Sequence, residues 1–208
     1  DPEAWRRLMQ AEKARGITYV VLAGAEPALV PEIVQACHAE MPLGTVATNG
    51  LVPIPAAVGY RLHISVWGND ATSRTVRGAK DMLARQAANY QGDDRAVFVY
   101  TFTARNISES HAVADYLAAR GCRLTFNVFS APESYSGPLR HSMASLVATR
   151  RAMLEITRRH PGHVLFSAYN AVVHTHALGL HDLFACPYPR RNPSTSLGLG
   201  RSFRQYRV

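Results

Sequence analysis

Residues 96–103 read Ala-Val-Phe-Val-Tyr-Thr-Phe-Thr, an almost unbroken run of β-branched and aromatic residues. A short run with so little polar alternation is typical of a strand that is buried on both faces of a parallel sheet. Other short segments have a similar strand-like composition. We predict strands over five of them: 17–22, 44–47, 61–66, 123–129 and 163–168.

Segments with helical periodicity separate these strands along the chain. The predicted helices cover 1–16, 29–40, 70–90, 108–120 and 140–160. Strands and helices that alternate in this way predict an α/β fold, in which helices cover a parallel sheet. Open doubly wound sheets and barrels share the pattern, and both bind ligands at the carboxyl ends of their strands.

The composition is that of a globular domain. The chain has 208 residues, of which 47% are hydrophobic and 18% are charged, and this length allows one domain with a sizeable core, or one domain with a small appendage. The longest apolar runs have strand length, so we expect no membrane span. Three widely spaced cysteines argue against a disulfide framework and against a self-contained four-cysteine metal site: Cys37, Cys122 and Cys186.

The basic charge is concentrated at one end of the chain. The formal net charge is +8, and residues 183–208 contain five arginines and no acidic residue. The remaining chain is therefore nearly balanced. Because nucleic-acid-binding proteins usually carry a basic stripe across the fold, we expect no nucleic-acid partner for the body of this protein.

Polar or glycine-containing segments follow five consecutive predicted strands, at 23–27, 48–50, 67–70, 104–106 and 130–135. Parallel strands end at the same edge of a sheet, so these segments predict one shared site. Each segment taken alone is equally compatible with an ordinary turn. Within 61–67 the side chains alternate, which predicts that His63, Ser65 and Trp67 lie on one face of the sheet.

The order of these segments resembles that of the radical S-adenosylmethionine (radical SAM) enzymes. In that family, strands end successively in Gly-Gly-Glu-Pro, in Thr-Asn-Gly, in a serine followed by Arg-Gly, and in Asn-Ile-x-Glu. The resemblance covers roughly residues 1–130 and implies a partial (β/α)6 barrel. The matching residues here are 24–27, 48–50, Ser65 with Arg77-Gly78, and 106–109.

The resemblance implies that the first two segments bind S-adenosylmethionine (SAM). In the family, the acidic residue of the first segment receives the amino group of the methionyl moiety. That residue is Glu26 here. The other cofactor-binding positions implied in these two segments are Gly24, Ala25, Pro27, Thr48 and Asn49.

The later segments are expected to bind the rest of the same molecule. Ser65 matches the family's polar group for the ribose or the carboxylate. Arg77, which we prefer over Arg74, is expected to pair with the carboxylate, because a guanidinium can form two parallel hydrogen bonds to it. Asn106 is expected to contact the nucleoside.

Family membership also implies the chemistry of the intact enzyme. SAM bound at a [4Fe–4S] cluster is cleaved to a 5′-deoxyadenosyl radical, which then modifies a substrate; we expect a small molecule, a peptide or a natural-product precursor. An electron donor such as flavodoxin or ferredoxin would reduce the cluster. These requirements imply a cytoplasmic enzyme.

Two features depart from the family pattern. Ala25 stands where the family has a second glycine, and the Cys-x3-Cys-x2-Cys loop that holds the cluster is not in this sequence. In the family that loop follows the first strand and precedes the first helix, and this chain begins at Asp1 with what reads as that helix. We therefore expect a fragment in which the first strand and the cluster loop are missing, residues 1–160 form the partial barrel core, and residues 161–208 begin a C-terminal extension.

Other features of the chain leave further readings open. We expect no metal ligands in the core, and Cys186 is a candidate ligand for an auxiliary cluster. An alternative function is that of another α/β-barrel enzyme acting on a phosphorylated metabolite, with 196–200 as its glycine-rich loop. A further alternative is a non-enzymatic α/β module that binds nucleic acid through the basic tail.

Overall fold

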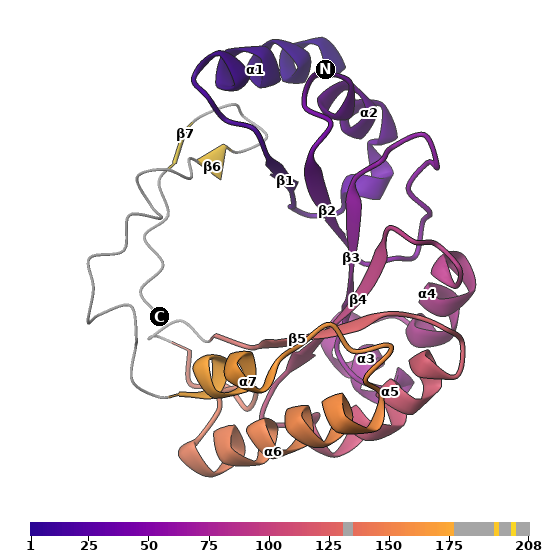
Figure 1. Ribbon diagram of the computed structural model, residues 1–208, viewed down its shortest axis with the longest axis vertical. Coiled ribbons are helices and arrows are strands. Elements are labelled where there is room, and N and C mark those ends of the chain that lie inside the picture. The colour runs from indigo at the N-terminus through magenta and orange to yellow at the C-terminus, as the bar shows by residue number, and fades with distance from the viewer. Residues whose placement is uncertain (131–134, 177–193, 196–200, 203–208) are drawn as a thin grey trace.

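Five parallel strands form the centre of the protein. The computed structural model describes residues 1–130, 135–176, 194–195 and 201–202 (Figure 1). Each strand pairs with the next one in the chain, and all four pairings are parallel. The strands are β1 (Val20–Leu22), β2 (Gly44–Thr48), β3 (Arg61–Val66), β4 (Ala96–Phe102) and β5 (Leu124–Val128).

The sequential strand order distinguishes the two α/β architectures that the sequence leaves open. A doubly wound sheet reverses direction at a switch point, whereas the order here runs β1-β2-β3-β4-β5 without reversal, as in a barrel. In Figure 1 the sheet curves into an arc, with α1 (Pro2–Ala14), α2 (Pro31–Glu40) and α6 (Met143–Arg159) on its outer side. The predicted α/β fold and partial barrel are confirmed.

The remaining elements are short. The helices α4 (Met82–Tyr90) and α5 (Ser110–Ala118) also cover the outer side of the arc, and α7 (Ala168–Thr175) packs against α6. Two 3₁₀ turns, η1 and η2, span Pro27–Leu29 and Ile107–Glu109. A small antiparallel pair is formed by β6 (Ser194–Thr195) and β7 (Arg201–Ser202). No helix among the described residues is long and apolar enough to cross a bilayer.

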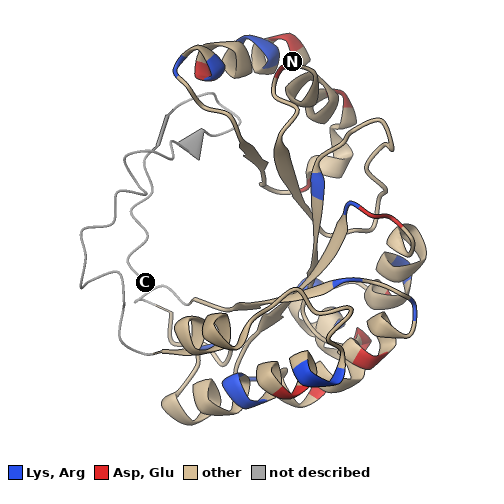
Figure 2. Cartoon of the chain, viewed as in Figure 1, with Lys and Arg blue, Asp and Glu red and all other residues tan. Residues whose placement is uncertain are grey.

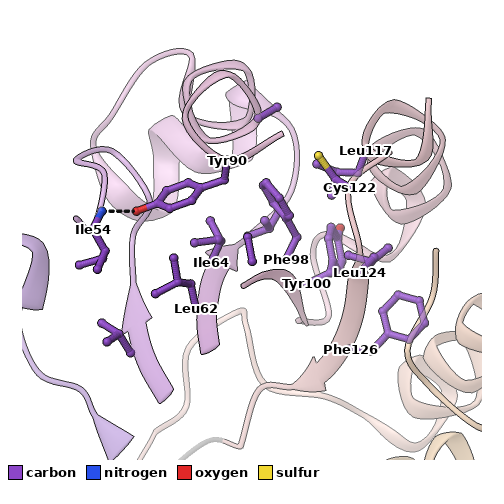
Figure 3. Close-up of a cluster of buried hydrophobic side chains, with 14 of the residues drawn as sticks. Ile54, Leu62, Ile64, Tyr90, Phe98, Tyr100, Leu117, Cys122, Leu124 and Phe126 are labelled. Carbon is purple, nitrogen blue, oxygen red and sulfur yellow. Dashed lines mark hydrogen bonds between the residues drawn. The ribbon is translucent and has the colours of Figure 1, made fainter. Parts of the chain in front are cut away.

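The core lies between the sheet and the outer helices (Figure 3). Leu62 and Ile64 of β3 point toward α4, where Tyr90 is also buried. Alternate side chains of a strand point to opposite faces, so burial of this face leaves the other face of β3 toward the inner side of the arc. The aromatic side chains of β4 and β5 extend the same core through edge-to-face contacts.

Two predicted elements differ from the structure. The helix predicted over 70–90 is two helices, α3 (Asp70–Arg77) and α4, because Gly78 adopts the left-handed conformation at φ +69° and Asp81 does so at φ +52°. A left-handed residue interrupts the helical hydrogen-bond ladder. The helix predicted over 108–120 begins later, because residues 107–109 form the 3₁₀ turn η2 and α5 starts at Ser110.

The predicted last strand, 163–168, is reduced to a single parallel bridge between Val164 and Leu124. The segment turns into α7 at Ser167, whose hydroxyl accepts a hydrogen bond from the Asn170 amide. This capping bond favours the helix over continued strand pairing. The division of the chain at residue 160 stays a prediction, although α7 is joined to α6 by a hydrogen bond from Arg150 to Thr175.

Charged residues of both signs cover the outer helices, as Figure 2 shows for α1 and α6. This agrees with a nearly balanced body. The arginine-rich tail lies outside the residues whose side chains the structure describes.

Arg95 fixes the loop that leads into β3. Its guanidinium donates hydrogen bonds to the carbonyl oxygens of Ile54, Pro55 and Val58, at 3.3, 2.9 and 2.5 Å, and it forms an ion pair with Asp93 at 2.7 Å. The side chains of Arg95 and Asp93 are 20% and 22% exposed. Hydrogen bonds to a largely buried charge are stronger than those at the surface.

We expect Arg95→Ala to lower the free energy of unfolding by about 3 kcal/mol, because it leaves three carbonyls and a carboxylate without their partner. Urea denaturation measures the change. The matched control is Arg151→Ala, whose side chain is 81% exposed and pairs with Glu155, and it should cost less than about 0.5 kcal/mol. Equal losses in the two variants would contradict the role assigned to Arg95.

The same ion pair predicts a pH dependence. The Arg95 guanidinium lowers the pKa of Asp93 below its ordinary value of 3.8. The stabilisation that Asp93 contributes is therefore fully present above pH 3.8 and is lost as the pH falls through the lower pKa of the folded state. We expect the stability difference between the wild type and Asp93→Asn to shrink from pH 6 to pH 3, as measured by urea unfolding at each pH. The neighbouring, fully exposed Asp94 supplies the control in Asp94→Asn.

Candidate functional site

The predicted site segments gather at the carboxyl ends of β1 to β4, because parallel strands present those ends at one edge. Residues 23–27 follow β1, residues 48–50 end and follow β2, residues 67–69 follow β3 and residues 103–109 follow β4. We call this edge the strand-end site. The predicted segment after β5, 130–135, falls mostly outside the described residues.

Glu26 joins the first two strand ends. One carboxylate oxygen, Oε1, accepts hydrogen bonds from the Ala28 amide at 3.1 Å and from the Thr48 hydroxyl at 2.5 Å. The other, Oε2, accepts from the Asn49 amide at 2.7 Å. A carboxylate offers about four acceptor positions, so this half-buried side chain keeps one for a ligand.

The residues around Glu26 have mainly structural contacts. Thr48 is buried, and its hydroxyl also accepts a hydrogen bond from the Gly50 amide. The Asn49 side chain accepts one from the Leu51 amide. Pro27 begins η1. Gly24 and Ala25 are exposed, and a Cβ added to Gly24 would meet no atom within 4 Å.

The alternation predicted for β3 is observed. Leu62, Ile64 and Val66 are buried, whereas Ser65 is half-buried and His63 is exposed. Among the described residues, no side chain forms a hydrogen bond with the Ser65 hydroxyl, which leaves it open to a ligand. Desolvation lowers the pKa of the His63 imidazole, which favours its neutral form.

Arg77 lies over the aromatic ring of Trp67, with its guanidinium carbon 4.9 Å from the ring centroid. Desolvation lowers the pKa of this guanidinium, and the negative charge of Glu26 acts in the opposite direction. Arg77 and Glu26 are therefore close enough to interact electrostatically. Within the described part of the chain, the guanidinium has no hydrogen-bond acceptor, so its donors are available to an anionic group. Arg74 has no such ring contact among these residues.

Asn106 is fully buried. Its amide nitrogen donates to the carbonyl oxygens of Trp67 at 3.0 Å and Thr101 at 2.9 Å, and its amide oxygen accepts from the Thr103 amide at 2.8 Å. The side chain thus joins the ends of β3 and β4. Its expected contact with a nucleoside stays a prediction.

Two further residues support the site through contacts that the sequence does not predict. Gln86 of α4 is buried, and its amide nitrogen donates to the carbonyl oxygens of Asn49 and Ser65. Glu109 accepts hydrogen bonds from the Asn69 amide in the loop after β3 and from the Thr72 hydroxyl of α3. In the sequence, Gln86 is recognisable only as an amide side chain on an otherwise apolar face of a predicted helix. Glu109 is the last residue of the motif at 106–109, and the sequence does not indicate its contacts.

The described residues do not fit a [4Fe–4S] cluster. They contain no group of three or more His, Cys, Asp or Glu side chains that could hold a metal. Cys37 and Cys122 are buried and unpaired. Burial raises the pKa of the Cys37 thiol to about 11 and also raises that of Cys122, which opposes the thiolate form that iron requires. Cys186 and the loop 196–200 lie outside the described residues.

Solved structures with a similar arrangement include SuiB of Streptococcus suis bound to S-adenosylmethionine (TM-score 0.63, 14% identity, 80% of this chain and 43% of that chain). The same protein has been solved with precursor peptide SuiA (TM-score 0.63, 14% identity, 81% of this chain and 44% of that one). TYW1 with a lysine-pyruvate adduct matches with a TM-score of 0.58 at 12% identity, over 82% of this chain and 67% of that chain. SuiB and TYW1 are radical SAM enzymes.

The chain has the fold of the radical SAM enzymes. The fold expected from the sequence resemblance is thereby confirmed. The chain spans less than half the length of SuiB, between 43% and 47%. No family model and no curated protein matches the sequence.

Proposed function

We propose that this chain supplies the SAM-binding part of a radical SAM enzyme, with the strand-end site holding the methionyl moiety. The proposal rests chiefly on one observation: at the carboxyl edge of the sheet, Glu26 retains an acceptor position, and the Arg77 guanidinium lies over Trp67 with no hydrogen-bond acceptor among the described residues. A zwitterionic amino acid group carries the complementary pair of charges. SuiB, which has a similar fold, has been solved with SAM bound.

The available hydrogen-bonding groups match this assignment. Glu26 retains one acceptor position for an ammonium group, since three of its positions are already used. The guanidinium of Arg77 can donate two parallel hydrogen bonds to a carboxylate. We assign the Ser65 hydroxyl to a ribose or carboxylate oxygen, because no side chain among the described residues bonds to it.

The proposal extends to the whole enzyme. When bound, a [4Fe–4S] cluster would supply the electron that cleaves SAM, and we assign its ligands to residues other than those described here. We propose a peptide as the substrate class, by analogy with SuiB, which has been solved with a precursor peptide. We also propose that a reduced flavodoxin or ferredoxin donates the electron to the cluster. The enzyme is proposed to be cytoplasmic.

Binding of SAM to the chain tests the site. We expect Arg77→Ala and Glu26→Gln each to weaken SAM binding about tenfold, because each removes one charge-assisted contact worth roughly 1.5 kcal/mol. Isothermal titration calorimetry measures the dissociation constants. Glu26→Gln keeps the size of the side chain and one accepting oxygen, so it removes the charge and the hydrogen bond from either the Ala28 or the Asn49 amide, and circular dichroism checks that the fold is unchanged.

Arg74→Ala is the matched control, because Arg74 lies one turn before Arg77 on α3 and is also exposed. It should leave the dissociation constant within about twofold of the wild type. Unchanged affinity in both test variants would show that the residue assignment is wrong.

Radical chemistry needs a separate test on the full-length enzyme that contains this chain. After anaerobic reconstitution with iron and sulfide, addition of reductant and SAM should release 5′-deoxyadenosine, detected by chromatography. In that enzyme Arg77→Ala should lower the yield of 5′-deoxyadenosine at sub-saturating SAM. The yield should return to the wild-type level at high SAM, because the variant weakens binding rather than cleavage. A reconstituted enzyme that releases none would contradict the proposed reaction.

A further inference from the structure

The helix that carries Arg77 is weakly packed. Along its eight residues, α3 buries only Ser73. Burial of apolar side chains usually fixes where a surface helix lies, and most helical stability comes from such packing. The position of Arg77, at the last turn of α3, must therefore depend mainly on how the first turn is held.

Glu109 holds that first turn from the adjacent strand end. Its carboxylate accepts hydrogen bonds from the Asn69 amide at 2.8 Å and from the Thr72 hydroxyl at 2.5 Å. Asn69 is itself the N-cap of α3, and its side chain accepts from the amides of Ala71 and Thr72. A carboxylate at this end of a helix is also favoured by the helix dipole.

The backbone between Trp67 and Asn69 is shaped to admit the Glu109 carboxylate. Gly68 adopts φ +129°, and a Cβ at this position would lie 2.4 Å from Glu109 Oε2. On the other side of Gly68, the Asn106 amide donates to the Trp67 carbonyl oxygen. The loop 67–69 is thus held on both sides by the segment that follows β4.

This loop also determines where the Trp67 ring lies. The ring contacts Phe129 edge-to-face, with centroids 6.0 Å apart, and Arg77 lies over it. One end of α3 is tied to the loop by Glu109, and the other end returns to the same loop through the contact between Arg77 and Trp67. A cation–π contact of this kind contributes about 0.5–1 kcal/mol where it is exposed, too little to hold a helix by itself.

We propose that Glu109 is a positioning residue for the SAM site: by fixing the first turn of α3, it holds Arg77 over Trp67. Glu109 acts through Arg77 and need not touch the ligand. The inference rests on the proposed function for its effect on SAM, whereas its structural part concerns only α3 and can be measured without SAM.

Trp67 fluorescence reports the structural part directly. The chain has two tryptophans, so Trp5→Phe leaves Trp67 as the sole tryptophan, which is excited selectively at the long-wavelength edge of the absorption band. In this background, Arg77→Ala should raise the acrylamide quenching constant about twofold, since it uncovers one face of the ring. We expect Glu109→Ala to raise it equally, and the double variant to raise it no further, because both changes remove the same contact.

Two milder variants guard against a general loss of structure. In Glu109→Gln the side chain can still accept a hydrogen bond from the Asn69 amide and donate one to the Thr72 hydroxyl. This variant should therefore keep the wild-type quenching constant. Thr72→Val removes one of the two hydrogen bonds and should give an intermediate value. The control is Glu155→Ala, which removes a half-exposed carboxylate that pairs with His111 and Arg151 on the outer helices and should change nothing.

The SAM dissociation constant, measured on the same variants, separates the two proposals. Glu109→Ala should weaken binding about as much as Arg77→Ala, roughly tenfold, and Glu109→Gln should restore it. If Arg77→Ala leaves SAM binding unchanged, the assigned site is wrong, and quenching alone then decides whether Glu109 fixes α3. The positioning role is overturned if Arg77→Ala weakens binding while Glu109→Ala changes neither the quenching constant nor the affinity. It is also overturned if the effects of the two substitutions on the quenching constant add in the double variant. Changed quenching with wild-type affinity would also overturn its role in binding.

Discussion

The parallel pairing of β1 to β5 is the constraint on which the rest of the protein depends. Strands that run in the same direction must be joined by crossovers, and here the crossovers after β1, β3 and β4 contain helices, whereas the one from β2 to β3 contains none. The same pairing brings the carboxyl end of every strand to one edge. Glu26, Ser65 and Asn106 are far apart in the sequence, yet the pairing alone is enough to bring their strand ends together.

At that edge, the strand ends are connected by side-chain to main-chain hydrogen bonds. Glu26 links the first end to the second, Gln86 links the second to the third, and Asn106 links the third to the fourth. A buried polar group is costly unless its hydrogen bonds are satisfied, so each link fixes both partners. Two of these links, Gln86 and Asn106, have almost no exposed surface and therefore support the site from behind the ligand-binding groups.

The apolar runs and the alternation in β3 were sufficient to predict the fold class, because they reflect burial that the sheet imposes directly. Local conformation was harder to predict. Asp81 adopts a left-handed conformation that no periodicity reveals, and it helps divide a predicted helix in two. In the site, the resemblance to the radical SAM enzymes indicated Glu26 and Arg77, whereas the role of Glu109 depends on its approach to Gly68, which the sequence does not show. Motif spacing identifies residues that meet at an edge and does not show which of them face a ligand.

The length of β1 has a consequence for the behaviour of the protein in concentrated solution. β1 is an edge strand of the described sheet and has only three residues, of which Val21 is 62% exposed. An exposed edge with apolar side chains can pair with the edge of another molecule and begin aggregation, and short edge strands reduce that hazard because they offer few backbone groups. Among the described residues, the brevity of β1 therefore leaves few unpaired backbone groups at this edge of the sheet.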